Sequence, residues 1–380
     1  MKSLSPLVML FAAGFTTAGA PAQTTSATLA SNATVYASGL EGPRGLTFGP
    51  DGTLYVAEAG LAGTTSTVGT CPQVIPPIGP YVGGPTARIS KVDTARNRTT
   101  LASGLPSART ANGDYVGVAD VAFLNGSLYA MLAGGGCSHG NSTQPNAIIK
   151  VNQKNGRWTY VTDLSSALLD HPAKYTSPDD YEPDGSWFGM IASEGLLYAV
   201  EPNHGQIFSI APSGRVRQVI DVSASQGHIV PTSIVAVDDV LYVGNLGLFP
   251  IDPQWERVIT VAKDIFIPNP LPGFDGPEQN YARWKIVSSK AGFTTIVGMK
   301  VGPDGLLYVL ELSDAPGFPS PGKGKVVRVK RNGTIEEVVT GLVVPTGMTF
   351  GPDGALYISN FGAAPGAAGQ ILRVSVQGAF

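Results

Sequence analysis

Residues 45–56 read Gly45-Leu-Thr-Phe-Gly-Pro-Asp-Gly-Thr-Leu-Tyr55-Val, and residues 347–358 repeat them closely as Gly347-Met-Thr-Phe-Gly-Pro-Asp-Gly-Ala-Leu-Tyr357-Ile. Each copy predicts an apolar strand, a tight turn and a second apolar strand, because Pro-Asp-Gly tolerates the backbone angles of a hairpin turn. Between them lie four further copies, so the repeat occurs six times. The other copies begin at Asp120, Gly189, Ser233 and Gly298 and end near Tyr129, Tyr198, Tyr242 and Tyr308.

A second hairpin follows most copies of this NHL-like repeat. Lys325-Val-Val-Arg-Val, for example, leads to Ile335-Glu-Glu-Val-Val. In the fourth unit we expect Arg257-Val-Ile-Thr-Val as third strand and Trp284-Lys-Ile-Val as fourth, separated by a Pro-rich insertion near residues 265–280. Units of four strands bury both faces when they stack around an axis. The sequence therefore predicts an all-β, six-bladed β-propeller with four-stranded blades.

The two ends of the chain are predicted to meet in the last blade. The sixth unit stops after Ile371-Leu-Arg-Val-Ser-Val and lacks a fourth strand. Val35-Tyr-Ala-Ser-Gly-Leu40 resembles Leu101-Ala-Ser-Gly-Leu105, which ends a fourth strand. We therefore expect residues 34–37 to complete the last blade, which closes the ring and removes an exposed sheet edge.

The N-terminus is typical of a signal peptide for export. Lys2 precedes the apolar stretch 7–15, and Ala20-Pro-Ala22 is a cleavage motif. We expect a signal peptide over residues 1–22 and a single propeller domain over 23–380, exported to the periplasm or the cell exterior. The apolar stretch is too short for a stable membrane span. In an oxidising compartment, Cys71 and Cys137 are expected to form a disulfide, because their loops belong to neighbouring blades.

The composition excludes some partners. The formal net charge is −3 and no Lys- or Arg-rich run occurs, so we expect no nucleic acid and no anionic membrane as partner. We call the face that carries the starts of the first strands the top face. The connections from second to third strands, expected over residues 59–87, 133–147, 312–324 and 361–369, lie there as well. Variable loops on a rigid scaffold are a common place for function.

The ends of the second strands form a predicted ring on the top face. Five of the six positions, three residues after each repeat tyrosine, carry an oxygen ligand that could hold a divalent cation such as calcium. The alternative is that these side chains make hydrogen bonds between blades. The five metal candidates are Glu58, Glu201, Asn245, Glu311 and Asn360, and the sixth position is Leu132.

A second set of polar residues predicts a ligand pocket. Asp120 stands where the other repeats begin with a small residue, and all four histidines, His171 included, fall in top-face connections. The alternative is that each histidine is solvated or bonded to the backbone. Glu182, Glu201, Asn203, His204 and His228 are expected to line one pocket. The candidate ligand-binding residues are Asp120, His139, Glu182, Glu201, Asn203, His204 and His228.

Four motifs resemble the ScyD/ScyE family, whose namesakes belong to cyanobacterial gene clusters for the pigment scytonemin. They are Glu182-Pro-Asp-Gly-Ser-Trp187, Glu201-Pro-Asn-His-Gly205, Ser225-Gln-Gly-His-Ile-Val-Pro-Thr232 and Gly244-Asn-Leu-Gly-Leu-Phe-Pro-Ile251. The resemblance covers nearly the whole chain after residue 22 and implies the propeller fold, but no established reaction. The insertion near residues 265–280 departs from the family pattern.

The chain is also distantly similar to gluconolactonase/regucalcin-type propellers, and this resemblance implies a divalent cation at the axis. Two functions of different class follow. The first is an exported protein that binds a small molecule, glycan or protein at its top face. The second is a metal-dependent lactonase or hydrolase, in which a cation polarises a carbonyl and a carboxylate or histidine moves protons. A quinone-dependent sugar dehydrogenase is a third alternative.

Overall fold

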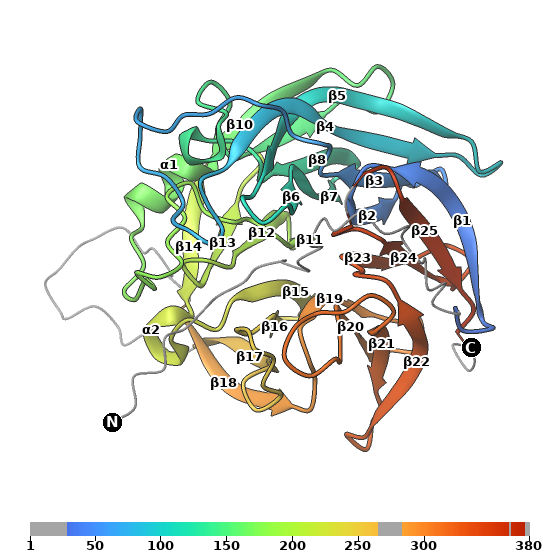
Figure 1. Ribbon diagram of the computed structural model, residues 1–380. Coiled ribbons are helices and arrows are strands. Elements are labelled where there is room, and N and C mark those ends of the chain that lie inside the picture. The colour runs from blue at the N-terminus through green and yellow to red at the C-terminus, as the bar shows by residue number, and fades with distance from the viewer. Residues whose placement is uncertain (1–28, 265–282, 365, 377–380) are drawn as a thin grey trace, which may run out of the picture.

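The computed structural model describes residues 29–264, 283–364 and 366–376. The predicted signal peptide and the Pro-rich insertion near residues 265–280 lie outside the described residues. The described strands form six antiparallel sheets around a common axis, as predicted (Figure 1). Among the described residues, no helix is both long enough and apolar enough to span a bilayer.

The first three blades follow one another along the chain, and each begins with its innermost strand. The first blade contains β2 (Pro43–Phe48), β3 (Leu54–Glu58), β4 (Val82–Val92), β5 (Arg98–Arg109) and the short additional strand β6 (Tyr115–Val116). The second contains β7 (Val118–Leu124), β8 (Ser127–Leu132), β9 (Ala147–Val151) and β10 (Trp158–Asp163). The third contains β11 (Met190–Ser193), β12 (Leu196–Glu201), β13 (Gln206–Ile210) and β14 (Val216–Asp221).

The last three blades complete the ring. The fourth contains β15 (Pro231–Val237), β16 (Val240–Asn245), β17 (Arg257–Asp264) and β18 (Arg283–Ala291), which confirms the strands predicted on both sides of the insertion. The fifth contains β19 (Ile296–Val301), β20 (Leu307–Glu311), β21 (Gly324–Val329) and β22 (Ile335–Leu342). The sixth contains β23 (Gly347–Phe350), β24 (Leu356–Asn360), β25 (Gly369–Val374) and β1 (Ala33–Leu40).

Strand β1 closes the ring as predicted. It pairs antiparallel with β25, and Thr34, Val35 and Ala37 lie opposite Arg373, Leu372 and Ile371. Around the axis the innermost strands β2, β7, β11, β15, β19 and β23 each contact the next, and β23 contacts β2. The N-terminal strand therefore joins the C-terminal blade, as the blue and red ribbons beside each other in Figure 1 show.

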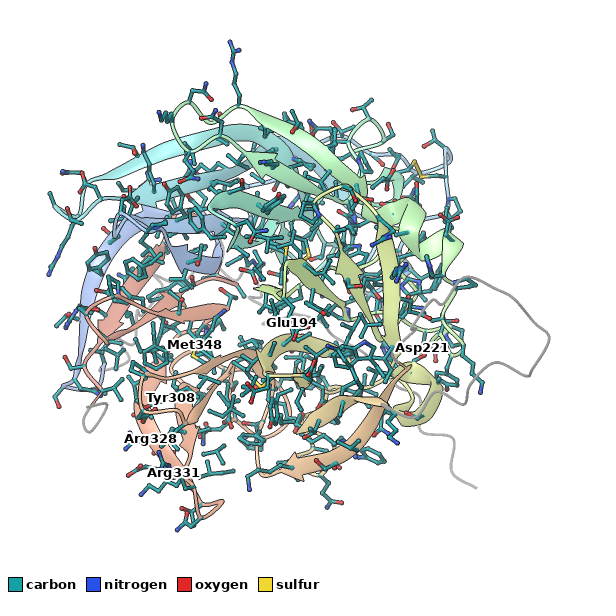
Figure 2. All side chains as sticks on the ribbon, turned by 180° about the vertical axis from the view of Figure 1, so that it is seen from behind. Glu194, Asp221, Tyr308, Arg328, Arg331 and Met348 are labelled. Atoms are coloured by element: carbon teal, nitrogen blue, oxygen red, sulfur yellow. A yellow bond between two sulfur atoms is a disulfide. The ribbon has the colours of Figure 1, made fainter. Side chains whose placement is uncertain are left out.

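The Pro-Asp-Gly sequence forms the turn and also supplies a carboxylate that binds neighbouring strands, as the fifth blade shows. Gly305 adopts a positive φ of 72°, which a glycine permits without strain. Asp304 before it accepts a hydrogen bond from the hydroxyl of Tyr308, the repeat tyrosine, at 2.8 Å. Arg328 on the next strand donates to the same hydroxyl at 3.2 Å (Figure 2). The repeat thus carries a turn and the polar contacts that join it to two strands of its blade.

Close packing at the axis explains the glycines that open several repeats. A Cβ added at Gly45 would lie 1.8 Å from a carboxylate oxygen of Asp120, and one at Gly189 would lie 2.4 Å from the Thr232 carbonyl oxygen.

The hydrophobic core lies between blades. One cluster, for example, joins Met131 of the second blade to Phe208 of the third.

The expected connection over residues 59–87 is wrong at its C-terminal end, because β4 already begins at Val82. Val82, Gly83 and Gly84 pair with Arg109, Ala108 and Ser107, so β4 and β5 extend beyond the length of the other blades. The side-chain pattern of this glycine-rich stretch is not that of a strand, and its strand conformation comes from pairing with a distant segment. The first blade consequently reaches toward the second on the top face, where Gly83 lies against Gly140.

Three short helices lie in the connections that the structure describes. They are η1 (Cys137–His139), α1 (Leu164–Asp170) and α2 (Ser223–Gln226). Helix α1 is capped at its N-terminus by Asp163, which accepts a hydrogen bond from the Ser166 backbone N–H. Helix η1 ends at the buried His139, whose ring lies between Tyr81 of the first blade and Glu182 before the third.

Candidate functional site

A small cavity lies on the top face beside the axis and has a volume of about 40 Å³. That volume holds only a few water-sized groups, since one water needs roughly 10–15 Å³ measured in this way. We call it the top-face cavity. Its walls come from the starts of innermost strands and from the connections above them. The lining residues are Arg44, Tyr81, Thr110, Asp114, Val116, Gly117, Ala119, Ala133, His139, Glu182, Ser186, Trp187, Phe188 and Thr346.

His139 is the one predicted histidine that lines this cavity. Its Nδ1 lies 2.6 Å from the carbonyl oxygen of Gly135. A carbonyl oxygen only accepts hydrogen bonds, so Nδ1 must carry a proton. The other ring nitrogen, Nε2, lies 3.5 Å from Oε2 of Glu182. In neutral His139, Nε2 therefore presents a lone pair toward Glu182, which makes it the atom that can take up a proton.

His139 and Glu182 form a buried pair that can share one proton. Both side chains are almost fully buried. Burial by itself lowers the pKa of His139, but the hydrogen bond and charge of Glu182 outweigh it and raise that pKa above its ordinary value. Tyr81 stacks on the His139 ring, with the two centroids 4.8 Å apart. A proton held between a buried imidazole and a carboxylate is what general acid–base chemistry requires.

Arg44 and Asp114 form a second buried pair on the cavity wall. The guanidinium Nη2 lies 3.6 Å from Oδ1 of Asp114 and donates to the carbonyl oxygen of Tyr115. Burial raises the pKa of Asp114 to about 7, although Arg44 opposes this shift. Burial also lowers the pKa of Arg44. The cavity therefore disfavours isolated charge and holds its charges as opposite pairs.

Two further histidine–carboxylate pairs lie next to the segment that carries Glu182. His228 Nε2 lies 2.9 Å from Oδ2 of Asp180, and His204 Nδ1 lies 3.1 Å from Oε2 of Glu201. Burial raises the pKa of Asp180 to about 6. Asn203 joins the two pairs, because its side-chain oxygen accepts from the Glu182 backbone N–H at 2.9 Å and its amide donates to the Asp180 carbonyl oxygen.

The structure thus brings six of the seven predicted ligand-binding residues into one neighbourhood. His139 and Glu182 line the cavity, while Glu201, Asn203, His204 and His228 hold the segment that carries Glu182. His171 lies apart from this group, with Nδ1 3.0 Å from the Ala167 carbonyl oxygen at the end of α1.

Asp120 occupies a different place. It lines a second small cavity, of about 40 Å³, between the starts of the innermost strands. Its two carboxylate oxygens accept hydrogen bonds from the backbone N–H groups of Met190 and Val121, both at 2.8 Å. Burial raises the pKa of Asp120 to about 6, while the charge of Lys300 opposes this shift. Asp120 therefore ties the second blade to the third at the axis.

The candidate metal ligands Glu58, Glu201 and Glu311 are each used within their own part of the ring. Glu58 binds Arg88 at 2.8 Å and the Ser90 hydroxyl, and Glu311 accepts from the Thr294 hydroxyl at 2.8 Å. Glu201 accepts from the backbone N–H groups of Ser186 and His204. Each carboxylate therefore accepts hydrogen bonds from backbone or side-chain donors close to it.

The two asparagine candidates behave in the same way. The side-chain oxygens of Asn245 and Asn360 accept from the backbone N–H groups of Arg257 and Val343, both at 2.8 Å. Within residues 29–264, 283–364 and 366–376, no three His, Cys, Asp or Glu side chains are grouped so that they could hold a metal ion. This donor arrangement does not fit the axial cation that the gluconolactonase-type resemblance implies.

The predicted disulfide between Cys71 and Cys137 is present, with 6.4 Å between the Cα atoms. It joins the connection before β4, which carries Tyr81, to helix η1, which carries His139. The Thr67 hydroxyl donates to the Cys137 carbonyl oxygen and strengthens the same junction. The two stacked rings of the cavity wall therefore come from loops that are covalently linked.

The sequence interpretation missed Arg44, Tyr81, Asp114, Asp180 and Trp187. Arg44 precedes the first copy of the repeat, and Trp187 ends the motif that begins at Glu182, so both had a local signal. Tyr81, Asp114 and Asp180 lie in irregular connections. Their positions depend on how the connections cross the top face, which no local pattern describes.

Solved structures of very different function have a similar fold. A gluconolactonase from Xanthomonas campestris is 11% identical with a TM-score of 0.50 and matches 90% of this chain and 89% of its own. A Thermus thermophilus protein described as an oxidoreductase (glucose dehydrogenase) is 16% identical, with a TM-score of 0.50, and matches 92% of this chain and 100% of its own. An auxiliary nutrient binding protein from Bacteroides thetaiotaomicron is 10% identical, with a TM-score of 0.52, and matches 90% and 76%.

At these identities the similarity shows a shared propeller fold and no shared activity. A comparison with models of known protein families finds no match to this chain, and a comparison with curated proteins finds none either.

Proposed function

We propose that the protein binds a small polar organic molecule in the top-face cavity. The observation that carries the proposal is a set of buried polar atoms that find no hydrogen-bond partner within the described part of the chain. Three of them belong to cavity-lining residues, namely Nε2 of His139, Oδ1 of Asp114 and Nε1 of Trp187. An unpaired buried polar group costs about 1–3 kcal/mol, so a ligand that pairs with it is bound more tightly.

A second candidate function is hydrolysis of a small ester or lactone, and the His139–Glu182 pair favours it. In this reaction Nε2 of neutral His139 takes a proton from water while the water oxygen attacks the carbonyl carbon. The carbon–oxygen bond to the leaving group then breaks, the leaving oxygen takes the proton, and a carboxylic acid and a hydroxyl group result. Similarity in fold to a gluconolactonase supports this candidate, whereas similarity to a nutrient binding protein supports binding alone.

The hydrolysis proposed here runs through the chain's own side chains. The described carboxylates do not form a cation site, so no step is assigned to a metal. Glu182 orients the imidazole and stabilises its protonated form, as the raised pKa of His139 indicates. Tyr81 stacks on the imidazole and fixes the plane of the ring.

We also propose that the protein is a relative of the ScyD/ScyE family and acts outside the cytoplasm. The Glu182–Trp187 motif, which supplies two cavity residues, is one of those that resemble the ScyD/ScyE family. A role outside the cytoplasm is compatible with the Cys71–Cys137 disulfide, because disulfides persist in oxidising compartments.

The test compares His139→Gln and Glu182→Gln with wild type. Binding of a panel of the smallest lactones, esters, amides and diols is measured by ligand-observed NMR, and acid release from the lactones and esters is measured by titration at constant pH. If the protein is a hydrolase, we expect each variant to lose about 100-fold or more in rate. His171→Gln is the matched control. His171 lies outside the cavity, so this variant should keep full activity.

The outcomes separate the two candidates. Binding that both cavity variants weaken, without any acid release by wild type, makes the protein a binding protein. Acid release that depends on His139 makes it a hydrolase. Binding and acid release that are absent, or that neither variant changes, would show that the top-face cavity is not the functional site.

A further inference from the structure

The charged side chains around the top-face cavity occur in opposite pairs. Among the described residues that line it, Arg44 and His139 are the potential cations, and Asp114 and Glu182 are the carboxylates. Arg44 faces Asp114 at 3.6 Å, and His139 faces Glu182 at 3.5 Å. Each potential positive charge of the wall is thus already compensated, and neither sign is in excess.

The cavity also disfavours the charged form of the groups that line it. Burial raises the pKa of Asp114 to about 7 and lowers the pKa of Arg44. Burial, together with the nearby charge of Glu182, raises the pKa of the Tyr81 hydroxyl well above its ordinary value. A ligand that brought a net charge into this space would meet the same desolvation cost without an unpaired counter-charge to offset it.

Much of the remaining wall is apolar. Besides Thr110, Ser186 and Thr346, it consists of Val116, Gly117, Ala119, Ala133, Trp187, Phe188 and the Tyr81 ring. A ligand with a short carbon skeleton can bury apolar surface against these side chains. Its O–H or N–H groups can donate to Asp114 Oδ1 and His139 Nε2, and its oxygen can accept from Trp187 Nε1.

From this arrangement we infer that the cavity selects uncharged polar molecules and rejects the corresponding carboxylates. The inference rests on the proposed function of the cavity as a ligand site and specifies the class of ligand. If the protein hydrolyses its ligand, the same selection favours release of product, because a neutral ester or lactone becomes a carboxylate anion.

The experiment uses matched pairs of small molecules that differ chiefly in charge. The pairs are formamide with formate, acetamide with acetate, and ethylene glycol with glycolate, all of which are small enough for a cavity of about 40 Å³. Dissociation constants are measured by ligand-observed NMR on the full chain at about pH 8, above the pKa of about 7 at which Asp114 ionises. For every pair that binds, we expect the neutral member to bind at least about tenfold more tightly, a difference of about 1.4 kcal/mol.

Asp114→Asn tests the physical cause. The substitution keeps the shape of the side chain but removes the negative charge opposite Arg44, so a carboxylate ligand can take its place. We expect carboxylate affinity to rise about tenfold or more and the preference for the neutral member to disappear. Glu182→Gln should shift the preference in the same direction through His139. Glu336→Gln is the control, because Glu336 lies on β22, where it binds Arg328 at 2.9 Å.

Each result has a distinct meaning. Carboxylates that bind wild type as tightly as their neutral partners, or more tightly, would overturn the charge selection while leaving the cavity as a ligand site. A preference for neutral molecules that persists unchanged in both folded cavity variants would also overturn it. If none of the six molecules binds, the proposed ligand site fails, and the selection fails with it. Melting temperatures of the variants establish that they are folded.

Discussion

Glu201 is the residue on which much of the wall behind the top-face cavity depends. Its carboxylate accepts hydrogen bonds from the backbone N–H groups of Ser186, Asn203 and His204, at 2.8, 3.1 and 2.6 Å, and from the His204 ring. Burial alone would raise the pKa of Glu201, but the pair with His204 and the N–H donors lower it below its ordinary value. One ionised side chain therefore fixes two connections, and one of them leads directly to Trp187.

We predict that Glu201→Gln destabilises the protein by about 3 kcal/mol, because it leaves His204 without its buried carboxylate and replaces an acceptor by a donor. Urea unfolding followed by tryptophan fluorescence measures this loss. Glu194→Gln provides a comparison. Glu194 binds Lys263 at 3.1 Å on the surface, with the Glu194 side chain 48% exposed, so its loss should cost less than about 1 kcal/mol. Equal losses in the two variants would contradict the structural role of Glu201.

At the scale of elements, the top-face cavity depends on contacts between connections as well as on the starts of innermost strands. The connection before β4 supplies Tyr81, helix η1 supplies His139, and the segment before β11 supplies Glu182. The extended pairing of β4 with β5 brings the first of these toward the second, and the Cys71–Cys137 disulfide links them covalently. The stacking of Tyr81 on His139 is thus maintained by a cross-link between two loops of neighbouring blades.

We predict that the double variant Cys71→Ser/Cys137→Ser is less stable by up to about 4 kcal/mol, which is the chain-entropy value for a loop of this size. The 66-residue separation of the two cysteines sets that size. Ligand affinity should fall as well, because Tyr81 and His139 are no longer held together. Thermal unfolding and ligand-observed NMR measure the two effects.

A reducing agent provides an independent test of the Cys71–Cys137 disulfide. Wild type in excess dithiothreitol should unfold at the lower temperature of the double variant, while the variant itself should not respond. An unchanged melting temperature in fully reduced wild type, with two thiols titrated, would show that the cross-link contributes nothing to the cavity.

On the scale of the whole molecule, the ring encloses several carboxyl groups that prefer to be protonated. Burial is the leading cause in each case, and it raises their pKa values far above those of free carboxyl groups. The four groups are Asp114 at about 7, Glu256 at about 8, and Asp120 and Asp180 at about 6. The pKa values of Glu201 and of several surface carboxylates are lowered instead. Lowered carboxyl groups lose their protons below pH 5 in both states, so the raised groups decide how stability changes between about pH 5 and 8.

We predict that the folded protein becomes more stable as the pH falls from about 8 to about 5. In this range the folded state binds more protons than the unfolded state, whose carboxyl groups ionise near pH 4. The stability from these raised groups is therefore present at low pH and is lost as the pH rises through their folded pKa values. Urea unfolding across this range measures the slope. A free energy of unfolding that rises with pH would contradict the protonation of these groups.

The variants Asp114→Asn and Glu256→Gln measure how much each carboxyl group contributes to the change of unfolding free energy with pH. Both substitutions replace a group that is protonated at low pH by one that never ionises, so each should reduce the slope. Asp304→Asn is the control, because Asp304 is bound to Tyr308 and Arg328 at the turn of the fifth blade.

Much of the fold could be predicted because its signals are local and repeated. A tight turn between two apolar strands recurs in each blade, with Pro-Asp-Gly in the first, fifth and sixth. In the fifth and sixth blades the repeat tyrosine also donates to the turn carboxylate. The resemblance of residues 35–40 to the end of a fourth strand predicted the closure by β1, which the pairing with β25 confirms. The start of β4 at Val82 was missed, because Gly83 and Gly84 become a strand only through their pairing with Ala108 and Ser107.

By itself the sequence determined the six-bladed ring, its closure, the disulfide and the face on which the polar connections gather. Only the tertiary structure decided which polar residues meet. It separated Asp120 and the oxygen ligands of the second strands from the cavity, and it placed Arg44, Asp114, His139 and Glu182 around one small space. The physical reason is range. Turns and strands follow from neighbours in the chain, whereas the contacts of irregular connections depend on the packing of blades that lie far apart in sequence.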